Sequence, residues 1–150
     1  MGHVEHTAVG NAPRDFTFEY VNDYRNVPRW MFGIKEFKPA GEQSSGLGTV
    51  FDTAINLGPM TMHVRVDVVE WEEHTVFTLR AAEGQMRWLF ETLDSDTTRI
   101  TVVCDYSIGG GIAGRPLDLA IQAFIGPAIR HAEKNLRQLV ESGYRESSKA

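Results

Sequence analysis

This 150-residue sequence contains a single cysteine, no long apolar run and no concentration of positive charge. Cys104 has no second cysteine to pair with, so an intrachain disulfide is excluded and a reducing compartment is allowed. No stretch approaches the roughly 18 apolar residues of a transmembrane helix, and the N-terminus lacks the apolar core of a signal peptide. The 15 Lys and Arg are scattered and the net charge is −5, whereas binding to nucleic acid needs a basic surface. We therefore expect a cytoplasmic protein with no nucleic-acid partner and no stable membrane insertion.

The length and composition are those of one soluble domain. Hydrophobic residues make up 42% of the chain and charged residues 23%, which are ordinary values for a globular protein. A chain of this length buries roughly 68–70% of the surface that its unfolded form exposes, which is enough for a sizeable core. We expect a single domain over residues 1–150, with its core at about 3–142 and a frayed tail at 143–150.

Apolar and polar residues alternate with a period of two between residues 34 and 106. The clearest stretch is 62–68, in which every second residue is Met or Val. Such alternation is typical of an antiparallel sheet with one face in water and one face buried. Turn residues such as Gly58-Pro59 separate the stretches. The pattern predicts seven strands, at 3–9, 34–39, 49–57, 62–68, 77–81, 86–90 and 100–106.

Two short helices are predicted between the first and second strands. Asn11-Ala12-Pro13 is a helix start, because the Asn11 side chain can accept free amide hydrogens and a proline is tolerated in the first turn. This helix should turn Phe16, Tyr20 and Val21 inward, and a second turn or helix follows at 28–33.

One long helix is predicted after the last strand. It follows a glycine-rich break at Gly109–Gly114, and its apolar residues recur with helical spacing almost to the C-terminus. We expect a kink at Gly126-Pro127, where the proline removes a hydrogen bond, and an end at Gly143. A single helix laid across a curled sheet cannot fill its concave side, so we expect an internal cavity there.

Several segments resemble the START-like (SRPBCC) superfamily, and its polyketide cyclase/dehydrase-like branch in particular. They are Asn11-Ala12-Pro13, the aromatic helix after it, residues 23–30 and Gly46-Leu47-Gly48-Thr49, within a resemblance that covers roughly 3–142. It implies an α+β helix-grip fold, Bet v 1-like, in which a seven-stranded antiparallel sheet wraps around the long C-terminal helix. It also implies a cavity for a hydrophobic or aromatic ligand. No single chemistry is implied, because the superfamily includes aromatase/cyclases, lipid carriers, hormone receptors and chaperone cofactors.

The walls of this cavity are expected on the buried strand faces, on the long helix and at the tip of the second short helix. Trp88 and Tyr106 carry polar groups that either orient a ligand or are satisfied within the core. The Trp30-Met31-Phe32 tip is either a lid over the entrance or a cap on the core. The expected ligand contacts are Trp30, Phe32, Phe51, Thr53, Ile55, Met62, Val64, Trp88, Phe90, Cys104, Tyr106, Phe124 and Ala128.

Candidates for catalysis are few. Cys104 alternates with apolar residues, so we expect a small buried hydrophobe rather than a nucleophile. His6 is either a hydrogen-bonded core residue or a proton carrier, and Tyr106 is the other weak candidate. Histidine, cysteine and carboxylate residues show no metal-site spacing, so no metal is expected.

The Gly109–Gly114 segment has the form G-x-G-x-x-G between a strand and a helix. A dinucleotide site needs a further parallel strand after that helix, and none is predicted. We interpret the segment as a connector or as a gating hinge at the cavity mouth, and we expect no cofactor.

Three hypotheses for the function remain. The first is binding of a hydrophobic or aromatic small molecule, such as a lipid, polyketide or related metabolite, in the internal cavity. The second is an enzyme of polyketide cyclase/dehydrase type that uses Tyr106 and His6 as proton carriers. The third is a toxin-like or chaperone-associated interaction module. Under each hypothesis we expect a monomer or a homodimer. The apolar inner face favours the first, because cyclisation needs polar groups that point inward.

Overall fold

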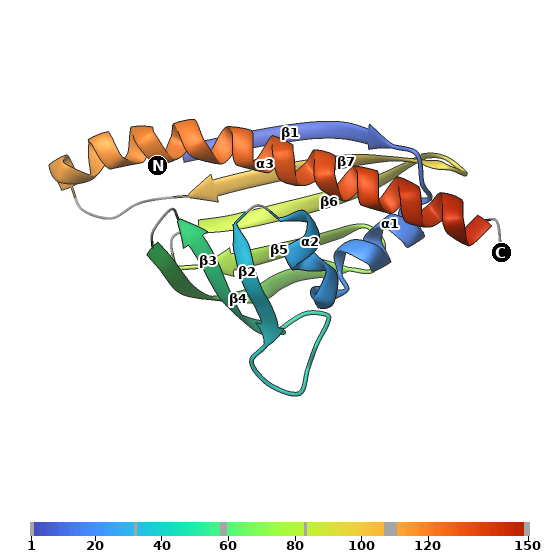
Figure 1. The fold of residues 1–150 in the computed structure, drawn as a ribbon, viewed down its shortest axis with the longest axis horizontal. Helices are drawn as coiled ribbons and strands as arrows, with labels where there is room; N and C mark the ends of the chain where they lie inside the picture. Colours follow the sequence, from blue (N-terminus) through green and yellow to red (C-terminus); the bar gives the residue numbers. More distant parts are fainter. Residues whose placement is uncertain (1, 32, 58–59, 83, 107–110, 149–150) are drawn as a thin grey trace.

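The computed structural model describes residues 2–31, 33–57, 60–82, 84–106 and 111–148, with the side chains of 57, 60, 111–125 and 148 excepted. These residues form a seven-stranded antiparallel sheet with short helices between the first two strands and one long helix at the end (Figure 1). The expected α+β helix-grip architecture is therefore confirmed. The strands are β1 (Gly2–Gly10), β2 (Ile34–Pro39), β3 (Val50–Leu57), β4 (Met60–Glu72), β5 (Val76–Ala81), β6 (Gly84–Asp94) and β7 (Thr97–Tyr106).

The sheet order is β1-β7-β6-β5-β4-β3-β2, so the first strand pairs with the last and the other neighbours are consecutive in sequence. Every expected strand is present, but β4 runs to Glu72, four residues beyond the expected end. A bulge between Val68 and Glu70 explains the difference, because it breaks the period of two while the strand continues. The bulge also turns Trp71 to the inner face, where it packs against the core.

The helical segments between β1 and β2 are α1 (Arg14–Val21), the 3₁₀ turn η1 (Tyr24–Asn26) and α2 (Val27–Trp30). Pro13 is the N-cap of α1, and no side chain caps the helix. The expected cap, Asn11, instead donates its backbone N–H to the Glu141 carboxylate at 3.0 Å. Inside the first turn the Thr17 hydroxyl donates to the Pro13 carbonyl at 2.8 Å.

The buried face of α1 contains Val21, as expected, but it does not contain Phe16 and Tyr20. Thr17, Phe18 and Val21 are buried, whereas Phe16 and Tyr20 are half-buried and pack against the edge of the core. This set follows from a helix that starts at Arg14, because positions three, four and seven residues later then share one face. Phe18 contacts the rings of Trp71, Phe77 and Phe90 edge-on and so anchors α1 to the sheet.

The long helix α3 spans Gly111–Ser148 and lies along the edge of the sheet beside β1 (Figure 1). It begins inside the expected glycine-rich break, runs through Gly126 and Pro127 without interruption, and does not end at Gly143. A Cβ at position 143 would make only an ordinary van der Waals contact with the Phe16 ring, at 3.6 Å, so packing does not require a glycine there. Tyr144 packs edge-on against Phe16 and donates its hydroxyl hydrogen to Asp96 at 2.8 Å. These tertiary contacts outweigh the preference of glycine for a helix end.

The two faces of the sheet differ sharply in character. The inner face carries the aromatic and aliphatic core, which includes Trp88, Phe90, Ile100 and Val102 at no more than 1% exposure. The outer face carries cross-strand ion pairs, each between an arginine and a carboxylate on the adjacent or next strand. They are Arg65–Asp52 at 3.0 Å, Arg80–Asp67 at 3.2 Å, Arg87–Glu70 at 2.9 Å and Arg99–Glu91 at 3.4 Å.

Candidate functional site

An apolar recess lies between the segment α1–η1–α2 and the inner face of strands β2 to β5. Its volume is about 400 Å³ when the part open to solvent is included, but the centre of a water molecule can occupy only about 20 Å³ of it. A single water needs about 10–15 Å³ on this measure, so an aromatic ring enters only if side chains or the rim move. The lining residues are Val21, Asn22, Tyr24, Val27, Trp30, Met31, Phe37, Ser44, Ser45, Gly46, Phe51, Val68, Trp71, Phe77 and Leu79.

Aromatic rings supply much of the wall of the recess. Phe51 stacks on Phe37 with ring centres 4.5 Å apart and meets Tyr24 at 6.3 Å. Phe77 stacks parallel to Trp88 at 6.2 Å, and Trp88, which does not line the recess itself, meets the lining residue Trp30 edge-on at 5.2 Å. The flat rings of the wall suit a flat apolar ligand, because offset and edge-on aromatic contacts are favourable.

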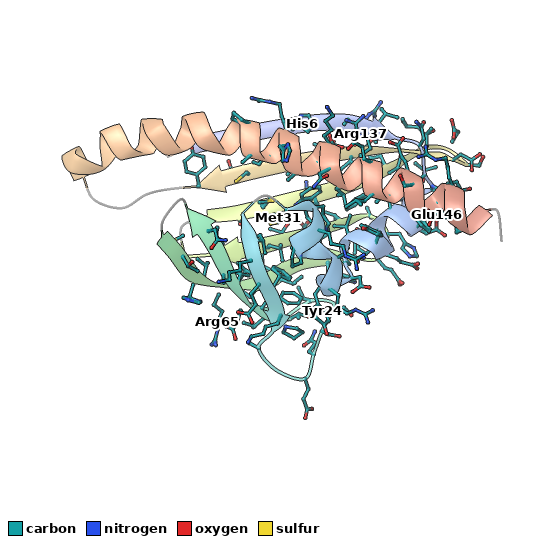
Figure 2. All side chains as sticks on the ribbon, viewed as in Figure 1. His6, Tyr24, Met31, Arg65, Arg137 and Glu146 are labelled. Atoms are coloured by element: carbon teal, nitrogen blue, oxygen red, sulfur yellow. The ribbon has the colours of Figure 1, made fainter. Side chains whose placement is uncertain are left out.

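The helical side of the recess is fixed to α3. Tyr24 and Met31 come from the segment that covers β2 to β5 (Figure 2). Pro28 lies in the first turn of α2, and the Asn135 side chain of α3 donates to the Arg29 carbonyl at 3.1 Å. The short helix therefore has a tertiary anchor that its own length could not supply.

The rim of the recess is the β2–β3 loop. Gly46 and Gly48 adopt left-handed backbone angles, φ +88° and φ +87°, which favour glycine over other residues. Thr49 is fully buried and donates its hydroxyl hydrogen to the Gly46 carbonyl at 2.8 Å. The Gly46-Leu47-Gly48-Thr49 motif thus shapes the turn that closes one side of the recess.

Two buried tryptophans carry polar groups in or next to the recess: Trp30 lines it, and Trp88 packs against Trp30. Trp30 is 2% exposed and Trp88 is 1% exposed, and among the described residues the indole nitrogen of each has no hydrogen-bond partner. Thr53 differs, because its hydroxyl donates to the Val64 carbonyl at 2.7 Å. The core satisfies Thr53 but leaves the two indole donors unpaired.

A second polar cluster lies between β1 and α3 (Figure 2). Glu133 has no exposed surface, and its Oε1 is 2.9 Å from His6 Nε2. Its Oε2 is 3.1 Å from Arg137 Nε, at angles that make this contact an ion pair rather than a hydrogen bond. His6 faces inward as expected. Its partner Glu133 is 127 residues away in the sequence, so no local sequence pattern predicts this contact.

Cys104 is not arranged for nucleophilic chemistry. Burial raises the pKa of its thiol to about 11, with a smaller contribution from the nearby Asp105 carboxylate. The thiol is therefore protonated near neutral pH, which agrees with the expected role of a small buried hydrophobe.

Within the part of the chain that the structure describes, no three histidine, cysteine or carboxylate side chains are grouped to hold a metal ion. The same residues contain no helix that is long and apolar enough to span a membrane. Every strand pairing among them is antiparallel, so the βαβ unit of a dinucleotide site is not formed around α3.

The sequence matches one family model over residues 1–141, and that family is described as polyketide cyclase/dehydrase and lipid transport. The chain belongs to this family. The match covers all seven strands and most of α3. No curated protein sequence matches the chain.

Solved structures share the fold of this polyketide cyclase/dehydrase family member at low sequence identity. A protein from Thermus thermophilus superimposes with a TM-score of 0.79 and 14% identity, covering 95% of this chain and 99% of that one. The Zhui aromatase/cyclase from a Streptomyces species has a TM-score of 0.76 and 17% identity, covering 93% of each chain. A START superfamily protein from Mycobacterium smegmatis has the same TM-score and identity, covering 93% of this chain and 97% of that one.

The residues expected to contact a ligand fall into four groups. Trp30 and Phe51 line the recess, and Phe32 and Phe124 lie outside the side chains that the structure describes. Met62 is 39% exposed rather than buried, and it lies opposite Ile55, close to the turn end of the β3–β4 hairpin. The others are buried or half-buried without lining the recess. On the sheet they are Thr53, Ile55, Val64, Trp88, Phe90, Cys104 and Tyr106, and on α3 Ala128.

Several residues of the recess were not predicted. Phe77 and Leu79 lie on a strand whose period of two already placed them inward, so the signal existed. Phe37 follows a bulge between Ile34 and Glu36, so the period of two did not place it on the face of Ile34. The bulge in β4 shifts Trp71 to the inner face, so the period of two did not predict it. Tyr24, Val27 and Met31 belong to short helical turns, and only the tertiary fold brings them over the sheet.

Proposed function

We propose that this protein binds a hydrophobic or aromatic small molecule in the recess between α1–η1–α2 and β2–β5. The observation that carries the proposal is the aromatic wall of the recess, to which Phe37, Phe51 and Phe77 contribute, around a space that opens to solvent. Membership of a family described by polyketide cyclisation and lipid transport supports the same class of ligand.

Binding in this recess requires local opening. The enclosed space of about 20 Å³ is far smaller than a benzene-sized cavity of about 150 Å³. Met31 is half-buried and unbranched, so it can change rotamer at low cost, and Ser44, Ser45 and Gly46 of the rim carry small side chains or none. The ligand-free protein is thus a closed form that a ligand opens.

We also propose that the protein is a single cytoplasmic domain, a monomer or a homodimer, with no nucleic-acid partner. The arginines of the outer sheet face are paired with carboxylates on other strands, so they offer little free positive charge to a phosphate backbone.

The test is ligand binding by native mass spectrometry and thermal shift, with a panel of fatty acids and polycyclic aromatics. We expect at least one aromatic member to bind and to raise the melting temperature, because a ligand specific for the folded state stabilises it. Met31→Trp fills the recess and should weaken binding at least about tenfold, through the clash that an overfilled site creates.

Leu93→Trp is the matched control for this variant. Leu93 is 44% exposed on β6 and is not part of the recess, so the added indole should leave affinity unchanged. Absence of binding by every panel member, or equal affinity of the two variants, contradicts the proposal.

A further inference from the structure

The exposed side chain of Gln43 bridges the turn that forms the rim of the recess. Its amide nitrogen donates to the Ser45 carbonyl at 3.0 Å and to the Leu47 carbonyl at 2.9 Å. A Cβ at position 46, where the chain has glycine, would lie 3.8 Å from the same nitrogen. Ser44, Ser45 and Gly46 line the recess, and Gln43 does not. The Gln43 amide therefore holds the rim from outside the site.

The β2–β3 loop is held in two ways along its length. At its base Gly48 donates its N–H to the Val68 carbonyl of β4 at 2.9 Å, so this part is attached to the sheet. At its tip, residues 44–47, carbonyl groups accept from the Gln43 amide and from the Thr49 hydroxyl, which belong to the loop itself. The tip can therefore move away from the recess when these internal hydrogen bonds break, while the base keeps its place.

The backbone of the tip has the freedom for such a movement. Gly46 and Gly48 have φ angles of +88° and +87°, and glycine reaches both signs of φ at little cost. Residues at the ends of a moving loop absorb its change in backbone angles, and small residues are frequent there. Backbone stiffness is thus a small barrier at this turn, and the hydrogen bonds within the loop are the main barrier to its opening.

We infer that Gln43 is a positioning residue for the rim and sets the rate at which a ligand enters and leaves the recess, without contacting that ligand. This inference rests on the proposed function and concerns the regulation of the same site. A flat ring passes the rim while the Gln43 bridge is broken, and the bridge re-forms behind it. Because Gln43 is not a lining residue, loss of the bridge changes both rate constants by the same factor and leaves the dissociation constant unchanged.

Glutamine has the chemistry that this bridge needs. The side-chain NH2 group carries two donors on one atom, so one nitrogen can serve two carbonyl oxygens. Glutamate has the same shape but only acceptors when ionised, so it would place a negative oxygen against both carbonyls. Lysine carries three donors on a flexible stem and can reach the same oxygens. Gln43→Glu therefore breaks the bridge with almost no change in side-chain volume, and Gln43→Lys keeps a donor in place.

The experiment measures rates and affinity separately, with anthracene as the probe. Stopped-flow fluorescence follows anthracene binding through the emission of the tryptophans, two of which, Trp30 and Trp71, line the recess. We expect Gln43→Glu to raise the association and dissociation rate constants at least about threefold, as for lost hydrogen bonds, and to leave Kd within about twofold. Gln43→Lys should keep the wild-type rates. Gln138→Glu, at an exposed glutamine of α3, is the matched control and should change neither rate.

The proposed function and the inference fail in different ways. Absence of anthracene binding by the wild type contradicts the proposed function, and the inference with it. Binding with the same rate constants in Gln43→Glu and the wild type overturns the inference and leaves the binding function standing. A rise in only one rate constant, with a matching change in Kd, also overturns it, and so does exchange in Gln43→Lys that is as fast as in Gln43→Glu.

Nuclear magnetic resonance of the ligand-free protein tests the bridge directly. In Gln43→Glu we expect the backbone order parameters of residues 44–47 to fall below those of the wild type. The order parameter of Gly48 should stay high, because its own hydrogen bond to β4 is intact. Gln43→Lys should keep the wild-type values throughout. If the order parameters of residues 44–47 are the same in Gln43→Glu and in the wild type, the inference is wrong.

Discussion

Cys104 projects from β7 onto the inner face of the sheet and keeps 9% of its surface exposed. Its thiol has a pKa of about 11, mainly because burial disfavours the thiolate. The Asp105 carboxylate is negative and raises the pKa further. At the scale of the single residue, the alternation of the sequence was enough to predict this inert thiol.

Alkylation should report the raised pKa directly. At pH 9 a cysteine with the ordinary pKa of 9.0 is half ionised, whereas one with a pKa of about 11 is about one per cent ionised. We expect iodoacetamide to modify Cys104 in the folded protein about fifty-fold more slowly than in the urea-unfolded chain, as measured by mass spectrometry. Equal rates in the two states contradict the assignment.

The same pKa fixes the direction of a pH effect on stability. The unfolded chain loses the thiol proton near pH 9 and the folded chain only near pH 11. This residue therefore lowers the free energy of unfolding as pH rises through that window. Cys104→Val should remove that part of the alkaline decline.

At the scale of the element, the position of α3 depends on a contact between charged or polar residues that are far apart in the sequence and that the sequence pattern did not predict. Glu133 is fully buried between His6 of β1 and Arg137 of its own helix. A buried carboxylate is costly unless it is paired, so this cluster fixes how α3 sits along β1. Arg137 is 32% exposed at its side chain and can reach water if its partner is removed.

Because Arg137 can reach water and Glu133 cannot, we expect removal of Arg137 to destabilise the protein more than removal of Glu133. Arg137→Met leaves the Glu133 charge buried with His6 alone, and we expect a loss of about 2–3 kcal/mol in urea unfolding. Glu133→Met leaves an arginine that can turn to solvent, and we expect a loss below about 1 kcal/mol. Arg130→Met, at an exposed position of the same helix, should be neutral. The reverse order of the first two variants contradicts this account.

Elements were predictable where the pattern is local. The period of two located the seven strands, and the proline and glycine positions located the short helices. Three features depend on contacts between distant parts of the chain and were missed: the continuation of α3 past Gly143, the bulge that turns Trp71 inward, and the Glu133 partner of His6. The recess itself belongs to this class, because its helical side is assembled from short turns.

At the scale of the whole molecule, the outer face of the sheet carries the arginine–carboxylate ion pairs and the inner face carries the aromatic core. Several carboxylates have lowered pKa values in the folded state. Hydrogen bonds from Arg87 and then Thr78 lower the pKa of Glu70, a hydrogen bond from Arg25 lowers that of Asp23, and one from Thr97 lowers that of Asp94. These groups stabilise the fold above their ordinary pKa values, and the contribution is lost as the pH falls through their folded values.

Acid should therefore weaken the fold in a way that Glu70 partly controls. We expect the free energy of unfolding, measured with urea, to fall between pH 5 and pH 3. Glu70→Gln should reduce this fall by about 0.5 kcal/mol, as for an exposed ion pair. Glu42→Gln, in the exposed β2–β3 loop, is the control and should leave the fall unchanged. A Glu70→Gln variant with the full acid decline contradicts the assignment.

The C-terminal half of α3 is tied to its surroundings at four places along its length: Glu133 to His6, Asn135 to Arg29, Glu141 to Asn11 and Tyr144 to Asp96. Displacing this half of α3 from the sheet would break all four contacts at once. The β2–β3 loop lies on the opposite side of the molecule from α3 (Figure 1). Gly48 and Thr49 of this loop are hydrogen-bonded to Val68 of β4, whereas the hydrogen bonds to Ser45 and Gly46 come from within the loop. We therefore expect the proposed ligand to exchange with solvent past the small turn at Ser44–Gly46, without displacement of the large helix.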